Sequence, residues 1–218
     1  MVKVELIDYM GGDDTVVNSA RVSFDKSAIN YTSDQNKKLI NYLAKHNHFT
    51  PFTHPQITLR ETVPIFVARQ RLKHFVGFTY NEVSRRYVDD EPEFYIPEVW
   101  RSRPEGNVKQ GSGGQNLNGC IVYDRLSCTD AYKLFLSHAE DLYKGMIQEG
   151  VAPEQARMVL PQSMYTSYYV TGSLAAFARF YKQRIDNHAQ KEIQELAKQV
   201  GDIIAPLFPV SWGALTDT

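Results

Sequence analysis

The sequence has few cysteines, no long apolar run and no excess of charge of either sign, and each shortage excludes a class of protein. Two cysteines, Cys120 and Cys128, occur in 218 residues. They are too few for a disulfide scaffold and too poorly spaced for a zinc site. No stretch approaches the roughly 18 apolar residues of a membrane span, and no signal-peptide pattern is present. We therefore expect a soluble cytoplasmic protein with reduced thiols and no membrane partner.

The charge balance also argues against one class of partner. The formal net charge is −1 at pH 7, whereas proteins that grip long nucleic acids normally show a broad basic surface. We therefore expect no nucleic-acid partner. Hydrophobic residues make up 43% of the chain, which is enough for a substantial core in one domain or in two small ones.

Glycine-rich and histidine-rich stretches are present, but they lack the spacing of familiar ligand motifs. Residues 106–119 read GNVKQGSGGQNLNG, which is neither a Walker loop nor a dinucleotide fingerprint. We expect a flexible surface loop over about 101–119, with little support for a role as a lid. Three histidines fall within 46–54, without a helical pair and a third carboxylate ligand. We expect no metal there, although His48 beside Thr50 could lie at a ligand.

Residues 64–87, PIFVARQRLKHFVGFTYNEVSRRY, concentrate charge and aromatic surface more than any other part of the chain. Pro64 and the apolar residues after it predict a helix that runs through about Lys73. Gly77 then breaks the helix and starts a loop. His74 and five strong cations are interleaved with aromatic side chains. The cations are Arg69, Arg71, Lys73, Arg85 and Arg86.

These cations admit two interpretations. Arginine offers a planar fork of donors that matches phosphate, and the polar residues after Gly77 add neutral donors in the predicted loop. The alternative is a solvated basic face whose aromatic rings lie in the core, and the cations alone do not separate the two. A succession of Asn, Glu, Ser and Arg residues has no use in a core strand. This mixture favours a site for a compact anionic ligand.

The apolar periodicity predicts short strands and several helices that do not alternate strictly, which is typical of an α+β domain. Strands are expected over 2–8, 55–63 and 164–170, and helices over about 33–46, 127–150 and 188–204, with further helices starting at Pro153 and after Ser173. Gly11 to Asp14 predict a turn, and Thr32 and Gln35 have the spacing of a capping box. Thr171 and Gly172 predict a break between the strand before them and the helix after them.

Arg157 is unusual because it lies between apolar neighbours in a turn that we expect to face the core. A buried arginine needs a partner. Arg157 is therefore either paired with a carboxylate or waiting for an anion.

Seven sequence blocks, taken in order, resemble the flavin-dependent thymidylate synthases. They are SARVSFD at 19–25, KHNHFTPF at 45–52, PIFVARQ at 64–70, NEVSRRY at 81–87, EFYIP at 93–97, EQARMVLP at 154–161 and RIDNHAQKEIQ at 184–194. Each block alone is modest, but together they span most of the chain and are highly specific.

This resemblance implies a methyltransferase that makes dTMP from dUMP. The methylene group would come from methylenetetrahydrofolate, and the reducing equivalents from NADPH through a tightly bound FAD. It also implies one domain over 1–218 with a mixed or antiparallel sheet and long helices. This domain would assemble as a homotetramer whose active sites lie at subunit interfaces.

The resemblance also assigns roles to individual positions. Catalytic roles fall on Arg184, Ser84 and His48, with Arg184 next to the uracil ring. The dUMP-binding positions are Gln70, Lys73, Glu82, Ser84, Arg85, Arg86, Arg157 and Arg184. The FAD-binding positions are Ser23, Thr50, Lys73, His74, Phe75, Glu82, Ser173, Arg179 and His188.

The chain departs from the family's pattern in two places. The family's signature is Arg-His-Arg, seven residues and then Ser-x-Arg, whereas this chain has Lys73-His74-Phe75 and eight residues before Ser84. The second arginine of the triplet is therefore missing, and with it a bidentate donor. Arg71 or Arg85 is a cation that could compensate. After Thr171, the chain has Ser173, Ala175 and Arg179 where some members carry Asn and Arg for the flavin.

The thiols exclude one alternative chemistry. The folate-only type of thymidylate synthase needs a cysteine nucleophile, and neither Cys120 nor Cys128 lies beside a His or Arg that would lower its pKa. The flavin route implied by the resemblance needs no protein nucleophile. In that route the polarisation of the uracil falls to Arg184.

Two other functions stay open from the sequence. One is a flavoenzyme of the same fold that leaves a different group, such as hydroxymethyl, on carbon 5 of a pyrimidine nucleotide. The other is a module that binds single-stranded nucleic acid and uses the basic aromatic run as a stacking platform. Product analysis separates the first from a thymidylate synthase, and a flavin spectrum argues against the second.

Overall fold

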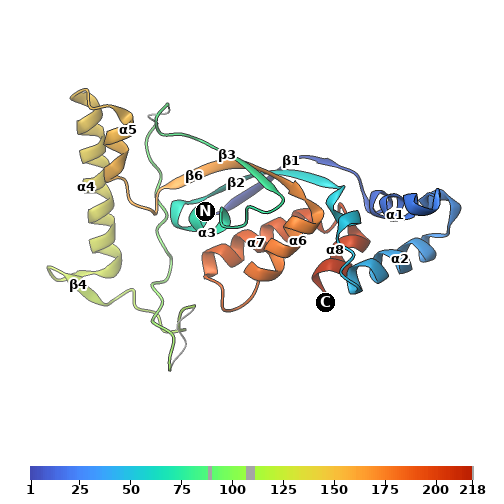
Figure 1. Ribbon diagram of the computed structural model, residues 1–218. Coiled ribbons are helices and arrows are strands. Elements are labelled where there is room, and N and C mark those ends of the chain that lie inside the picture. The colour runs from blue at the N-terminus through green and yellow to red at the C-terminus, as the bar shows by residue number, and fades with distance from the viewer. Residues whose placement is uncertain (88–89, 107–110, 218) are drawn as a thin grey trace.

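A computed structural model describes residues 1–87, 90–106 and 111–217. Its centre is a four-stranded antiparallel sheet in the order β1-β2-β6-β3 (Figure 1). The strands are β1 (Lys3–Met10), β2 (Gln56–Pro64), β6 (Tyr165–Ser173) and β3 (Phe78–Glu82). Every pairing between them is antiparallel. The α+β class is therefore confirmed, with an antiparallel sheet.

Helices cover one face of this sheet and extend beyond both of its ends (Figure 1). The helices are α1 (Asp13–Arg21), α2 (Ser33–Lys45), α3 (Ile65–Arg71), α4 (Cys128–Gln148), α5 (Pro153–Ala156), α6 (Leu174–Arg184), α7 (Lys191–Ile204) and α8 (Pro209–Thr216). In Figure 1, α3, α6, α7 and α8 lie below the sheet, α1 and α2 at one end, and α4 and α5 at the other. A small hairpin of β4 (Ile121–Tyr123) and β5 (Leu126–Ser127) precedes α4.

The core forms where the alternating residues of the strands meet these helices. On β2, Ile57, Leu59, Glu61 and Val63 are fully buried, while Thr58, Arg60 and Thr62 alternate with them on the other face. This is the period of two that a half-buried strand requires. The helices complete the core with apolar residues at helical spacing. These include Phe177 and Phe180 of α6 and Ile193, Leu196, Val200 and Ile204 of α7.

Several predicted elements are confirmed, together with the local signals behind them. The Thr32 hydroxyl accepts a hydrogen bond from the Gln35 backbone N–H at 3.3 Å, and the Gln35 side chain accepts one from the Thr32 N–H at 2.9 Å. This capping box starts α2 where the sequence predicts. Ser173 likewise caps α6, because its hydroxyl accepts a hydrogen bond from the Ala176 N–H at 3.3 Å.

Other predictions are wrong. The turn at Gly11 to Asp14 includes the first residues of α1, since Gly12 is its N-cap and Asp13 and Asp14 form its first turn. Helix α8 carries no strong periodic signal and was not predicted. The stretch after Gly77 is strand β3 rather than a loop, and Pro64 ends β2 as the N-cap of α3.

The predicted break at residues 171–172 is also wrong, because both residues lie inside β6. A Cβ atom on Gly172 would stand 2.3 Å from the ring of Phe78 on the neighbouring strand. The glycine is therefore needed for close approach inside the strand and does not mark its end.

Helix α4 has the predicted length but not the expected environment. Of its apolar residues, Leu134, Phe135 and Leu142 are 41%, 51% and 53% exposed. The helix stands at the end of the sheet rather than across it (Figure 1), so its apolar stripe has no sheet to cover it. Arg157, expected in the core, is exposed for the same reason. Within the predicted loop, Arg101 and Asn116 form an isolated antiparallel β-bridge. Residues 107–110 lie outside the described part of the chain.

A buried ion pair lies between the sheet and α3. The Arg71 and Glu61 side chains are both 0% exposed, and Arg71 Nε lies 3.0 Å from Glu61 Oε2. A second guanidinium nitrogen, Nη2, donates to Glu61 Oε1 at 3.1 Å, and the Tyr168 hydroxyl donates to Oε2 at 2.7 Å. Burial alone would lower the pKa of Arg71, but the charge of Glu61 outweighs this effect and raises it. Arg71 therefore keeps its charge in the interior.

We predict that Glu61→Ala lowers the free energy of unfolding by about 3–5 kcal/mol, because it leaves a buried guanidinium without its counter-ion. Chemical denaturation followed by circular dichroism measures this change. Lys198→Ala is the control, since it removes one partner of an exposed ion pair on α7 and should change stability little. Equal losses in the two variants would show that the buried pair has no special weight.

Candidate active site

One cavity lies where β3 and β6 pass the turn that follows α5. Its volume is about 680 Å³, and four of the predicted nucleotide-binding residues line it: Glu82, Ser84, Arg85 and Arg157. The end of β3 delivers Glu82, whose carboxylate accepts a hydrogen bond from the Thr166 hydroxyl at 2.6 Å. Ser84 and Arg85 follow immediately after the strand. The sequence spacing and the fold therefore bring these residues together.

The cations of this cavity differ in how strongly the protein already holds them. The Arg157 side chain donates one hydrogen bond, from Nε to the Glu154 carbonyl at 3.3 Å, and has no ion pair within the described residues. Arg85 donates to the Asp90 carbonyl. Arg86 lies outside the cavity wall, 3.2 Å from the Glu154 carboxylate. Arg157 and Arg60, which also lines the cavity and donates to the Ser167 hydroxyl at 3.0 Å, are therefore cations that the described protein holds by one hydrogen bond each.

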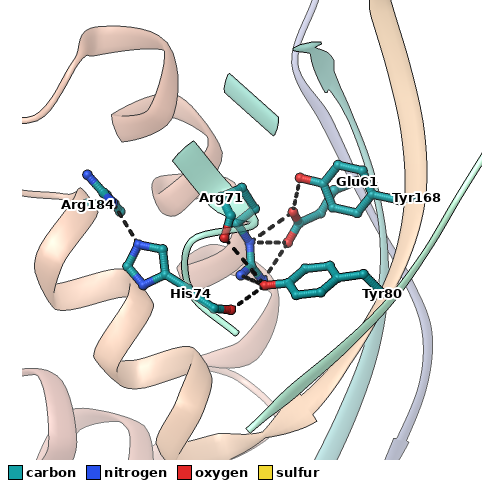
Figure 2. A network of polar contacts seen from close by, with 6 residues as sticks. All are labelled: Glu61, Arg71, His74, Tyr80, Tyr168 and Arg184. Carbon is teal, nitrogen blue, oxygen red and sulfur yellow. Dashed lines mark hydrogen bonds and ion pairs between the residues drawn. The ribbon is translucent and has the colours of Figure 1, made fainter. Parts of the chain in front are cut away.

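A second cluster of predicted residues lies between α3 and α6 (Figure 2). The His74 side chain is almost buried, with its residue 9% exposed, and its ring meets Phe180 edge to face at 5.1 Å. His74 Nε2 accepts a hydrogen bond from Arg184 Nε at 2.8 Å. Burial, together with the charges of Arg184, Arg71 and Arg179, lowers the pKa of His74 to about 4. The imidazole is therefore neutral at physiological pH, with its proton on Nδ1.

Arg184, the last residue of α6, is a half-buried cation. Its bond to His74 is its only hydrogen bond among the described residues, so its two terminal nitrogens have no protein acceptor there. Burial lowers the pKa of Arg184 from its ordinary value, but not enough to discharge a guanidinium. A partly desolvated charge without a carboxylate is suited to a polar group on a ligand.

The remaining predicted residues of this cluster surround the turn between α3 and β3. Gln70 donates to the Gln190 side chain at 2.5 Å, and Arg179 donates to the Val76 carbonyl. Lys73 is exposed, and Phe75, where the family pattern has an arginine, is 70% exposed. The turn therefore presents a cation and an apolar ring to the outside.

The structure excludes Arg71 as a substitute for the missing arginine of the signature. Its guanidinium is fully buried and bound by Glu61 and by the Tyr80 hydroxyl, so it cannot touch a ligand. Of the two cations that could compensate, only Arg85 borders a cavity.

A third group of predicted residues lies at the other end of the molecule. Ser23, His48 and Thr50 line a cavity of about 340 Å³ between α1 and the end of α2, together with Phe49. The last two flavin candidates are already engaged. Ser173 is buried as the cap of α6, and the exposed His188 ring lies 2.8 Å from the Asp186 carboxylate.

One further cavity, of about 410 Å³, lies beside α7 and is not predicted from the sequence. Its walls are aromatic, with Phe66, Tyr95, Trp100 and Tyr132, and it contains the ion pair of Arg101 with the buried Glu192 at 2.7 Å. Burial opposes ionisation of Glu192, yet hydrogen bonds, that of Arg101 foremost, hold its pKa below the ordinary value. The aromatic residues within 94–100 are the sequence feature that could have indicated this cavity.

The structure also bears on two possibilities considered from the sequence, a metal site and a membrane-spanning helix. Among the described residues, no group of three or more His, Cys, Asp and Glu side chains is arranged to hold a metal ion. No helix in that part of the chain is both long and apolar enough to span a membrane.

Comparisons with known proteins agree with the geometry. Residues 5–210 match the family model described as thymidylate synthase complementing protein. A flavin-dependent thymidylate synthase of Thermosipho africanus is 37% identical over 214 residues, which cover 97% of this chain and 89% of that relative. One of Thermus thermophilus is 35% identical over 214 residues, covering 98% of this chain and 75% of that relative.

Solved structures show the same relationship. The UMP/dUMP methylase PolB of Streptomyces cacaoi, bound with 5-Br UMP, superposes with a TM-score of 0.86 at 29% identity, covering 100% of this chain and 94% of that one. Its complex with 5-Br dUMP gives a TM-score of 0.81 and covers 95% of that chain. With the family model matched over 5–210 and these near full-length relatives, the chain belongs to the thymidylate synthase complementing protein family, that of the flavin-dependent thymidylate synthases.

Proposed function

We propose that this protein converts dUMP to dTMP, with methylenetetrahydrofolate as the carbon donor and NADPH as the reductant, through bound FAD. The observation that carries the proposal is a pair of arginines that have no ion-pair partner in the described chain. Arg157 lines the cavity beside β3, and Arg184 is half-buried at the end of α6. Near full-length relatives that are flavin-dependent thymidylate synthases support it. We place the reaction in the cytoplasm.

In this proposal the cavity beside β3 holds the nucleotide phosphate. Arg157 and Arg85 supply charged donors and Ser84 a hydroxyl, which is the donor set that a phosphate prefers. Arg86 joins them if the phosphate displaces Glu154. Glu82, already fixed by Thr166, is then an acceptor for an N–H or hydroxyl of the nucleotide.

Arg184 acts on the base. Its terminal nitrogens donate to a uracil carbonyl and stabilise negative charge that develops on the ring when carbon 5 reacts. The neutral His74 orients the guanidinium without cancelling its charge. Gln70, on the neighbouring helix α3, contributes a neutral amide to the same base.

The residues present fit a flavin. An FAD needs cations and hydroxyls for its diphosphate and ribityl chain and apolar surface for its ring, and the turn after α3 offers Lys73, Arg179 and the exposed Phe75. The cavity with Ser23, His48 and Thr50 offers further donors. When bound, the flavin supplies the redox chemistry that no side chain can provide. The neutral His74 and the positively charged Arg184 would then set the charge beside the flavin.

We further propose that complete active sites form between copies of the chain in a homotetramer. Strand β3 separates the two nucleotide half-sites, because it begins after the His74 turn and ends at Glu82. Its five residues place their first and last Cα atoms about 13 Å apart at roughly 3.3 Å per residue, so the two half-sites lie at opposite ends of the strand. The exposed apolar stripe of α4 offers a surface for association.

A second candidate is methylation of UMP as well as dUMP. It is favoured by the likeness to PolB, a UMP/dUMP methylase that superposes over the whole chain. Chromatography of the products from UMP and dUMP separates the two, and it also reveals a hydroxymethyl product. A nucleic-acid platform has less support, because Arg71 is buried and Arg86 is paired.

We predict that Arg157→Ala weakens dUMP binding at least tenfold, because a hydrogen bond to a charged group is worth about 1.5–3 kcal/mol. Isothermal titration of the flavin-loaded protein measures the change. Lys37→Ala, which removes an exposed charge on α2, is the control and should bind normally. Unchanged affinity in Arg157→Ala and Arg86→Ala together would contradict the phosphate assignment.

Subunit complementation tests the shared sites. We expect Arg157→Ala and Arg184→Ala to be nearly inactive alone, and a re-associated mixture to regain activity in about a quarter of its sites, since random pairing restores some intact ones. Turnover before and after denaturation and refolding of the mixture measures this. A mixture that stays as inactive as its components would mean that one chain builds each site.

The thiols should be dispensable. We expect a variant with both Cys120→Ser and Cys128→Ser to keep most of its turnover, because neither free thiol lines a cavity that holds the candidate residues. Steady-state assays with dUMP measure it, alongside a thermal melt. Loss of turnover with an unchanged melting temperature would show that a cysteine acts as a nucleophile.

A further inference from the structure

We propose that Tyr80 is a positioning residue. Its hydroxyl links the buried Arg71 to the main chain of His74, and this fixes the direction in which Arg184 presents its guanidinium. The proposal rests on the proposed function only in assigning Arg184 to the substrate. The network itself comes from the contacts in Figure 2.

The Tyr80 hydroxyl occupies the centre of the network. It accepts a hydrogen bond from Arg71 Nη1 at 2.7 Å and donates one to the His74 carbonyl at 2.6 Å. The Arg71 carbonyl is farther away, at 3.4 Å. Because the hydroxyl has one proton, the short bond to His74 is the one that it makes. A side chain on β3 therefore holds the backbone of the turn after α3 (Figure 2).

Arg71 makes this hydroxyl a fixed point. Two of its nitrogens bind Glu61, and its guanidinium carbon lies 4.1 Å from the centre of the Phe180 ring and 4.4 Å from that of Phe78. A guanidinium held by a carboxylate and by two rings has no room to turn. Tyr80 is thus tied to a fully buried side chain that is held on several sides.

Tyr80 is the side chain that holds the His74 carbonyl, whereas Arg179 holds the Val76 carbonyl and the Phe78 N–H holds that of Phe75 at 3.2 Å. Residues 72–77 connect α3 to β3 without regular structure, and Gly77 has φ of +79°. The exposed Phe75 and Val76 contribute no core packing. The His74 N–H donates to the Arg71 carbonyl at 3.0 Å, so Tyr80 completes the backbone bonding of His74.

The position of His74 in turn sets that of Arg184. The bond from Arg184 Nε to His74 Nε2 fixes the direction of the Nε–H and, among the described residues, leaves both terminal nitrogens for a ligand. A carboxylate in place of the imidazole would orient the guanidinium equally well but would neutralise it. The imidazole is kept neutral by burial and by the surrounding cations, Arg184 and Arg179 of α6 and Arg71 of α3. The full charge of Arg184 is therefore left for the substrate.

The test compares two tyrosines that bind the same ion pair. Tyr80→Phe removes the link to His74, whereas Tyr168→Phe removes a hydrogen bond to Glu61 on the other side and leaves that link intact. We expect Tyr80→Phe to bind dUMP about five- to tenfold more weakly, from the loss of one hydrogen bond's ordering effect. Tyr168→Phe should bind normally, although both variants melt at lower temperature.

A double-mutant cycle with Arg184→Lys identifies the route. Lysine cannot reproduce the Nε bond to His74, so Tyr80→Phe should have little further effect on dUMP affinity in that background. Additive losses, or an equal loss in Tyr168→Phe, would overturn the positioning role. Should Tyr80→Phe fail to fold, Arg71→Lys keeps the charge for Glu61 but cannot reach Tyr80, and it should show the same loss of affinity.

The pH dependence gives a readout that stability alone does not move. In the native protein His74 stays an acceptor down to about pH 4. Without its anchor the ring gains solvent, and its pKa rises toward the ordinary 6.5. The ratio of dUMP affinities of Tyr80→Phe and Tyr168→Phe, in which the phosphate's own titration cancels, should therefore fall between pH 7 and 5. A constant ratio would contradict the proposal.

The two proposals fail in different ways. If Arg184→Lys itself leaves dUMP affinity unchanged, the assignment of Arg184 to the substrate is wrong and both proposals fall. If Arg184→Lys weakens binding while Tyr80→Phe does not, only the positioning role of Tyr80 is overturned.

Discussion

The ion pair of Arg71 with Glu61 is the constraint on which the rest of the structure depends. Two charges removed from water are tolerated only when each finds full hydrogen bonding, and here the partners come from β2, α3, β6 and β3. The pair therefore ties four elements together at one point. The turn with His74 leaves this point directly, which is why a structural contact in the core bears on the candidate site.

Local signals predict the elements that local interactions decide. The capping box of α2 and the apolar period of α7 need no distant partner, and both helices lie where the sequence predicts. Helix α1 was missed because Gly11 and Gly12 are typical of a turn. A local cap, the Gly12 N–H donating to the Thr15 hydroxyl at 3.0 Å, is joined by a distant contact: the Asp13 carboxylate accepts hydrogen bonds from the N–H groups of Val210 and Ser211, both at 2.9 Å. No short-range pattern records that contact, and it also explains the unpredicted α8.

The chemistry of the basic run was predictable, but the environment of each cation was not. Spacing along 64–87 cannot tell that Arg71 turns inward, because its partner Glu61 lies on the preceding strand and alternation alone predicts an apolar residue there. In the same way Arg157 was expected in the core and is exposed, since α5 follows a helix that stands beyond the sheet. The residues of a site can be named from sequence, whereas their burial depends on the packing of whole elements.

Strand β3 joins the core network to both halves of the site. Tyr80, near its middle, faces the ion pair, while Glu82 at its end faces the cavity with Arg157. Because β3 is paired to β6 along its whole length, a shift of the strand would move both ends together. An anchor at Tyr80 therefore holds the His74 turn and also supports the register that brings Ser84 to the cavity lined by Arg157. A short edge strand without this anchor would have only five residues of pairing to hold two half-sites in place.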